Sequence, residues 1–187
     1  MNLRQRGLGF LLAFLAAPAS ATLPTHEQVR QLQQLFGFDS AVVQVMETEI
    51  GKEPAFADLA PAQRTCLLAR IEPIMSVKLV DAFRTLFGDE QTAGQWIAFA
   101  ETEGGGKLMQ FVRKGVESSI NGQPAPEPES MLGGMPQAAM MQVVEFMGTP
   151  AAKVLEREFP DLDMTDAELD AFKDDAQTHC GIEDTTL

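Results

Sequence analysis

The sequence predicts an all-α protein, a compact bundle of about seven to nine helices. Apolar residues recur at spacings of three and four along most of the chain, which is the period of an amphipathic helix. Glycine, proline and capping residues separate these segments. The alternation of apolar and polar residues that is typical of a half-buried strand is nearly absent. We therefore expect helices packed around one core.

The first 21 residues have the layout of a secretory signal peptide, and we expect them to be cleaved. Arg4 and Arg6 precede an apolar run at residues 8–17, and the small residues Ala19 and Ala21 suit a cleavage site. The apolar run is shorter than the roughly 20 residues that a membrane-spanning helix needs. These features predict a periplasmic protein.

Residues 22–187 are expected to form a single all-helical domain with no membrane span. Their number is sufficient for one buried core. The whole chain carries 27 acidic and 14 basic residues, for a formal net charge of −13. Nucleic acids and anionic lipids are bound through cationic side chains, so neither is an expected partner. The acidity fits either a cationic partner or solubility alone.

Capping signals define the first helices of this domain. Thr25 and Gln28 form a capping-box pattern before an apolar stripe, and Gly37 follows that stripe. A second helix is expected from about residue 40 to 51, with a loop at 53–60.

Prolines and capping residues punctuate the middle of the chain. Pro61 suits the first position of a helix, which Pro73 should kink or restart and Gly88 should stop. Asp89 and Thr102 can each cap a further helix.

The last third begins with a proline-rich loop at residues 123–130. Pro136 should then open a helix whose inner face is Ala139, Met140, Val143, Val144 and Met147.

Two more helix starts are expected, one at Thr149 and Pro150 and one at the capping box of Thr165 and Glu168. Asp161, Asp163 and Asp166 lack the glycine and glutamate of a calcium loop, so we interpret them as first-turn charges of the last helix.

Cys66 and Cys180 are the two cysteines of the chain, and we expect them to form a disulfide. An even number of cysteines in an exported chain favours pairing. Cys180 lies on the apolar stripe of the last helix, and Cys66 lies on an apolar stripe of its own helix. With only two histidines in the chain, a zinc site has too few well-spaced ligands.

A ten-residue unit occurs twice, at an offset of 47 positions. The segments at 99–108 and 146–155 both fit F-x-x-T-x-x-[small]-x-x-L. We interpret each copy as a helix, a corner and a second helix. The threonine caps the second helix, the small residue lets another helix approach, and the leucine points to the core. On this interpretation alanine is tolerated in place of the glycine. The predicted repeat positions are Phe99, Thr102, Gly105, Leu108, Phe146, Thr149, Ala152 and Leu155.

This unit resembles the pattern of the domain-of-unknown-function family 2059, whose members are exported bacterial all-α proteins. The family pattern is an aromatic pair, then Thr or Ser, Pro, a spacer and Gly. Neither copy has the second aromatic residue, since Ala100 and Met147 stand there. The resemblance covers residues 75–114 and more faintly 135–159. It implies an all-α periplasmic protein and transfers no functional residues.

The sequence contains no recognisable catalytic constellation, so we expect no enzyme, no cofactor and no resident metal. The leading expectation is a non-enzymatic binding or interaction module of the cell envelope, whose partner is an envelope protein or a small ligand. The alternative is copper handling by the methionine segment from Met131 to Met147, because clustered thioethers bind Cu(I). Core filling is the ordinary use of such methionines, and an adaptable binding groove is the next.

Overall fold

The structure is a computed structural model that describes residues 22–38, 44, 46 and 59–182. The predicted signal peptide, most of the predicted helix at 40–51 and most of the loop at 53–60 lie outside these residues. The expected all-helical class is confirmed, and no strand occurs in the described ranges. Their helices are α1 (His26–Phe36), α4 (Pro61–Phe87), α5 (Glu90–Ala100), α6 (Glu103–Ile120), α7 (Pro128–Leu132), α8 (Gln137–Met147), the 3₁₀ helix η1 (Pro150–Glu156) and α9 (Asp166–Cys180).

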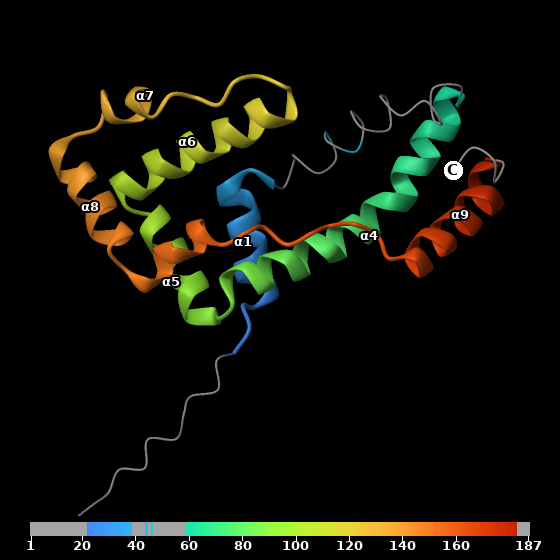
Figure 1. Cartoon of the computed structure of the whole chain (residues 1–187), viewed down its shortest axis with the longest axis horizontal. Coiled ribbons are helices and arrows are strands. Elements are labelled where there is room, and N and C mark those ends of the chain that lie inside the picture. Colours follow the sequence, from blue (N-terminus) through green and yellow to red (C-terminus); the bar gives the residue numbers. More distant parts are fainter. Residues whose placement is uncertain (1–21, 39–43, 45, 47–58, 183–187) are drawn as a thin grey trace, which may run out of the picture.

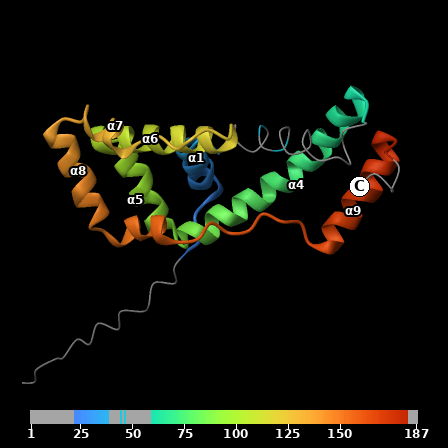
Figure 2. The ribbon, with the colours of Figure 1, turned by 45° about the horizontal axis from the view of Figure 1, so that its top comes forward.

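The long helix α4 connects the two ends of the molecule (Figure 1). Its 27 residues correspond to a length of about 40 Å. Pro61 occupies its first turn, as predicted. We expected Pro73 to kink or restart the helix. The helix does not restart there, and its ribbon bends along its length in Figures 1 and 2. An interior proline removes one backbone hydrogen bond and favours such a bend.

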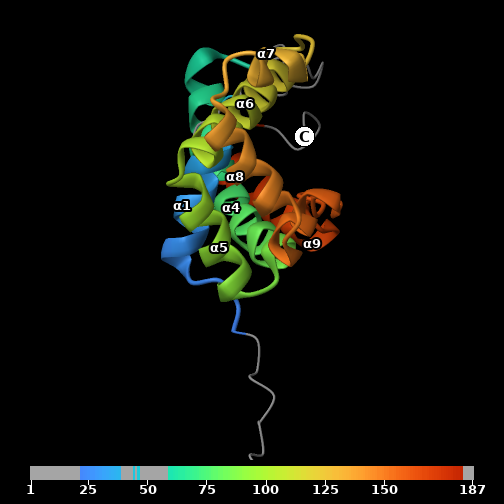
Figure 3. The same cartoon turned by 90° about the vertical axis from the view of Figure 1, so that its left-hand side faces the viewer.

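The larger of two buried clusters, which we call the corner core, gathers around the C-terminal half of α4. Helices α1, α5, α6, α8 and η1 pack together there, and α8 lies at the outer end of the molecule (Figures 1 and 3). The corner core consists of Val29, Leu32, Phe36, Leu79, Phe83, Phe87, Ala93, Trp96, Phe99, Met109, Phe146, Ala151, Ala152 and Val154.

The smaller cluster, which we call the arm cluster, lies between the N-terminal half of α4 and α9. Helix α9 packs beside α4 at the end of the molecule opposite α8 (Figure 1). The extended segment 157–165 leads to it, and Phe159 stacks on Phe38 with a ring-centroid distance of 5.4 Å. The arm cluster consists of Leu59, Leu67, Phe172, Ala176 and Ile182.

Most local predictions of helix starts agree with the structure. The capping boxes at Thr25 and Thr165 are both present, and Asp89 accepts a hydrogen bond from the N–H of Thr92. The predicted loop at 123–130 is wrong at its end, because Pro128 already opens α7. A proline in the first turn costs the helix no hydrogen bond, since that N–H would be unpaired in any case.

Within the described ranges, no helix has both the length and the apolar character needed to cross a lipid bilayer.

Candidate interaction surface

The two repeated segments meet face to face in the corner core. The rings of Phe99 and Phe146 stack with their centroids 3.9 Å apart and their planes inclined by 1°. The rings of Trp96 and Phe146 are nearly perpendicular, with their centroids 4.8 Å apart. The Nε1–H of Trp96 donates a 2.9 Å hydrogen bond to the carbonyl of Ala151. Equivalent aromatic residues of the two copies are therefore direct neighbours.

The two corners share one hydrogen-bond pattern. The N–H and the hydroxyl of Thr102 both donate to the carbonyl of Phe99, at 2.9 and 2.7 Å. Thr149 makes the same two bonds to the carbonyl of Phe146, also at 2.9 and 2.7 Å. In each copy the threonine thereby satisfies a carbonyl at the end of the preceding helix.

The helices that follow the two corners differ. Thr102 accepts a 3.0 Å hydrogen bond from the N–H of Gly105 and caps α6, as predicted. Thr149 makes no side-chain cap, and the segment after it is the 3₁₀ helix η1 (Pro150–Glu156). The predicted cap at Thr149 is therefore wrong. A 3₁₀ helix pairs residues three apart, which places its first N–H groups differently from those of an α-helix.

The close approach of a neighbouring helix occurs at Gly104 and not at Gly105. A Cβ atom on Gly104 would overlap the carbonyl oxygen of Ala139 in α8. A Cβ atom on Gly105 would overlap the carbonyl oxygen of Phe99, which belongs to the same corner. The expectation that alanine is tolerated at position 105 is therefore wrong. The equivalent Ala152 lies within the 3₁₀ helix η1 and is buried in the corner core.

The repeated leucines have different environments. Leu108 is half-buried and packs against the corner core. Leu155 is exposed, so the expectation that it points to the core is wrong. The 3₁₀ geometry of η1 changes the direction of each side chain relative to an α-helix.

A shallow groove with a volume of about 450 Å³ runs over the stacked phenylalanines. Its lining residues form four pairs at the repeat offset of 47 positions. These pairs are Gln95 and Gln142, Ala98 and Glu145, Phe99 and Phe146, and Thr102 and Thr149. The groove is thus formed equally by the two copies.

The inward side of α8 is rotated relative to the predicted one and shares only Ala139 and Val143 with it. Ala139 and Phe146 are buried, and Val143 is half-buried. The side-chain oxygen of Gln142 accepts a 2.8 Å hydrogen bond from the N–H of Gly104. This bond and the close approach of Ala139 to Gly104 orient the helix. The inward positions are consequently 139, 142, 143 and 146, which follow the spacing of one helical face.

The opposite side of α8 is apolar and exposed, and we call it the α8 apolar face. The exposed fractions are 37% for Met140, 53% for Met141, 62% for Val144 and 47% for Met147. The prediction that Met140, Val144 and Met147 fill the core is therefore wrong. The methionine Met135, just before the helix, is buried.

The charged residues on and near α8 have both signs. Helix α8 carries Glu145 and no basic residue. Glu127 and Glu129 lie at the start of α7, and η1 carries one charge of each sign, Lys153 and Glu156. Near the start of α8, Nζ of Lys107 donates a 3.4 Å hydrogen bond to the carbonyl of Gly134. The charge on α8 itself is therefore negative, whereas neighbouring segments carry both signs.

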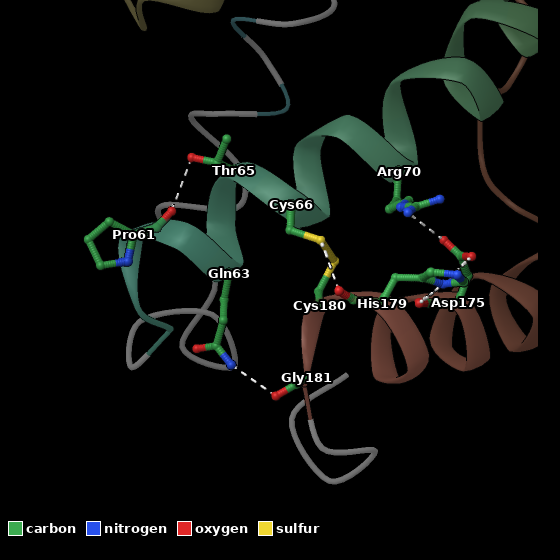
Figure 4. Close-up of a disulfide and its surroundings, with 9 residues drawn as sticks. All are labelled: Pro61, Gln63, Thr65, Cys66, Arg70, Asp175, His179, Cys180 and Gly181. Atoms are coloured by element: carbon green, nitrogen blue, oxygen red, sulfur yellow. Dashed lines mark hydrogen bonds and ion pairs between the residues drawn. A yellow bond between two sulfur atoms is a disulfide. The ribbon is translucent and has the colours of Figure 1, made fainter.

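Cys66 and Cys180 form the predicted disulfide, with their Cα atoms 5.7 Å apart (Figure 4). Gln63 supports it by donating a 2.9 Å hydrogen bond to the carbonyl of Gly181. Asp175 lies 2.9 Å from Nδ1 of His179 and 3.6 Å from Nε of Arg70. These contacts join the start of α4 to the end of α9.

Glu168 connects the start of α9 to α4. It forms a 2.8 Å ion pair with Lys78 and accepts hydrogen bonds from the N–H and hydroxyl of Thr165. The hydrogen bond from Lys78, followed by those from Thr165, lowers the pKa of this carboxyl from 4.5 to about 2. Folding therefore favours the ionised form of the Glu168 carboxyl.

The acidic residues before α9 form no metal site. Asp161 and Asp163 precede the helix, where the N–H of Asp163 donates a 3.0 Å hydrogen bond to the Asp161 carboxylate. Of the three predicted first-turn acids, only Asp166 lies in the first turn. Elsewhere in the described part of the chain, no group of three His, Cys, Asp or Glu residues is placed to hold a metal ion.

No family model, curated protein or solved structure matches this chain. The resemblance to the domain-of-unknown-function family 2059 stays a prediction that rests on the two corners.

Sequence reasoning missed the residues that orient α8. The run Gly104–Gly106 is a signal of close backbone approach, but the sequence does not say which segment approaches it. Gln142 is the repeat counterpart of Gln95, and its bond to Gly104 joins segments 38 positions apart. Only the tertiary structure could assign it a role.

Proposed function

We propose that this protein is an exported, non-enzymatic interaction module of the cell envelope, and that the α8 apolar face binds a helical segment of a partner protein. The observation that carries this proposal is the exposure of four large apolar side chains on one short helix. Contiguous exposed apolar surface is typical of interaction sites. Methionine suits such a site because its flexible thioether adapts to different partners.

The spacing of the α8 apolar face fits a helix as the partner. Met140, Val144 and Met147 follow the i, i+4, i+7 pattern of helix-in-groove recognition, and Met141 lies beside them. The face has Glu145 and no basic residue on its own helix, and the whole chain has a formal net charge of −13. A partner helix with an apolar stripe and lysine or arginine at its edges is complementary to this arrangement.

Copper handling by the methionine segment receives less support. Met140 and Met147 lie on the same side of α8 but two turns apart, which is about 10.5 Å along the axis. Thioether ligands of a single ion must converge on one point, and Met135 is buried away from solvent. The geometry of one chain therefore favours an apolar docking surface over a copper site.

The proposal is tested with two designed helical peptides that share one leucine-rich face. One peptide has lysine at the edges of that face, and the other has glutamate. We expect calorimetry to show binding of the lysine peptide, with a weaker or undetectable signal for the glutamate peptide. Val144→Ser should weaken binding by at least about tenfold, because it places a polar group in the centre of the contact.

Val77→Ser provides a matched control. Val77 is 63% exposed, close to the value for Val144, but it lies on α4 beside a separate apolar groove lined by Ile74 and Phe172. Peptide binding should be unchanged in this variant. Equal losses in Val77→Ser and Val144→Ser, or no binding of either peptide to the native protein, would contradict the proposal.

A further inference from the structure

The methionines of the described residues differ in exposure. Met140, Met141 and Met147 are exposed, and all three belong to the α8 apolar face. Met109 and Met135 are buried, with exposed fractions of 3% and 8%, and Met46 is buried as well. The other described methionines, Met75, Met131 and Met164, are half-buried. The three most exposed of these methionines are thus neighbours on one helix.

We infer that the α8 apolar face is a methionine-oxidation site at which peroxide switches off partner binding. The first part of this inference depends only on the exposure of the thioethers. The second part rests on the proposed function, because it requires a partner at the same face. Met140, Met141 and Met147 are the exposed thioethers and are also part of the α8 apolar face.

The chemistry is a two-electron oxidation of sulfur by hydrogen peroxide. The thioether sulfur attacks one peroxide oxygen, an S–O bond forms, and the O–O bond breaks. The sulfur loses two electrons, and the second oxygen leaves as water after proton transfer. Each methionine then carries a sulfoxide. In the reverse step two thiols of a reductase become a disulfide, and the sulfoxide oxygen leaves as water.

Oxidation should change the surface without unfolding the protein. A sulfoxide is polar and accepts hydrogen bonds, so its burial against an apolar partner carries a desolvation cost. The three methionines lie opposite the inward side of α8, which is held by Ala139, Gln142 and Phe146. The packing of α8 on the corner core therefore does not depend on them.

The modification itself is tested by peptide mapping after graded exposure of the full chain to hydrogen peroxide. We expect Met140, Met141 and Met147 to form sulfoxide at least about tenfold faster than Met109 and Met135, because access controls the reaction. Rates that do not separate these two groups would overturn the inference. Circular dichroism should show an unchanged melting temperature at full conversion of the exposed group, and loss of structure would also overturn it.

The switch is tested with the lysine-edged peptide and a triple variant, Met140→Leu, Met141→Leu and Met147→Leu. Leucine keeps the face apolar at similar volume and does not react with peroxide. We expect peroxide to weaken binding at least about tenfold in the native protein and to leave the variant unchanged. Persistent binding by the fully oxidised native protein, or an equal loss in both proteins, would overturn the switch.

If the proposed function is wrong, the peptide-binding experiment gives a different result. In that case neither protein binds the peptide before oxidation, which overturns the switch together with the function. Peptide mapping still decides whether the α8 apolar face is an oxidation site.

Discussion

The corner core and the arm cluster are stabilised in different ways. The corner core contains fourteen buried residues from six helices, and its rings contact one another through Phe36, Phe83, Phe87, Trp96, Phe99 and Phe146. The arm cluster contains five buried residues, and Phe172 is its one aromatic member. Small clusters bury too little apolar surface to offset chain entropy. The comparison indicates that the stability of the arm cluster depends on the cross-links between α9 and α4.

Those cross-links lie along the length of α9. The disulfide joins its end to α4, and the ion pair of Glu168 with Lys78 joins its start. Between them, Asp175 lies 3.6 Å from Arg70. The ion pairs are partly exposed and contribute little on their own, so the disulfide is the main constraint.

Removal of the disulfide should have the largest effect. For Cys66→Ser with Cys180→Ser, the chain-entropy model predicts a loss of up to roughly 4–5 kcal/mol, because the bond closes a loop of more than a hundred residues. Hydrogen exchange should accelerate first in α9, while Trp96 fluorescence still reports a buried indole. Equal acceleration in both regions would contradict the proposed difference between them.

Adding a methyl group at the first corner should destabilise the corner core. Gly104→Ala and Gly105→Ala each place a Cβ atom against a carbonyl oxygen, of Ala139 and Phe99 respectively. We expect each to cost about 1–3 kcal/mol in chemical denaturation.

Gly106→Ala is the matched control for these two variants. Its Cβ atom would lie 3.5 Å from the carbonyl oxygen of Ala100, which is an ordinary contact. Alanine is also favoured over glycine inside a helix by roughly 0.5–1 kcal/mol. Stability should therefore be unchanged or increased, and a loss equal to that at position 105 would contradict the steric explanation.

The two corner threonines, Thr102 and Thr149, should contribute differently to the free energy of unfolding. Thr102→Ala removes both the bond to the Phe99 carbonyl and the α6 cap, which should cost about 1 kcal/mol or more. Thr149→Ala removes only the bond to the Phe146 carbonyl, since Thr149 provides no cap. Its loss should be smaller in the same denaturation assay. Equal losses would restore the expectation that both corners are capped alike.

The smallest effect should be a pH dependence of the stability that Glu168 contributes to the packing of α9 on α4. The pKa of Glu168 is lowered in the folded protein from 4.5 to about 2. Its contribution is thus fully present above about pH 4.5 and is lost as the pH falls toward about 2. The stability difference between the native protein and Glu168→Gln should shrink over this range. A difference that stays constant between these pH values would show that the carboxylate has no such role.

Local chemistry made much of the fold predictable. The capping boxes of α1 and α9, the first-turn proline of α4 and the cap of α6 all depend on residues within one turn of each other. The disulfide was also predictable, because two cysteines on apolar stripes permit one intramolecular pairing. Such features need no knowledge of distant segments.

The candidate site depended on contacts between distant segments. The helix from Gln137 to Met147 has apolar residues on nearly all sides, so its sequence alone is compatible with several inward faces.

The sequence by itself determined where most of the described helices begin, because capping and proline geometry are local properties of the chain. It also determined that two similar corners exist. Only the tertiary structure decided that Phe99 stacks on Phe146 and that α8 turns Ala139 and Gln142 toward Gly104. The physical reason is that glycine lets the two backbones approach, and the buried N–H of Gly104 then needs an acceptor from the facing helix. That contact leaves the methionines of α8 exposed to solvent.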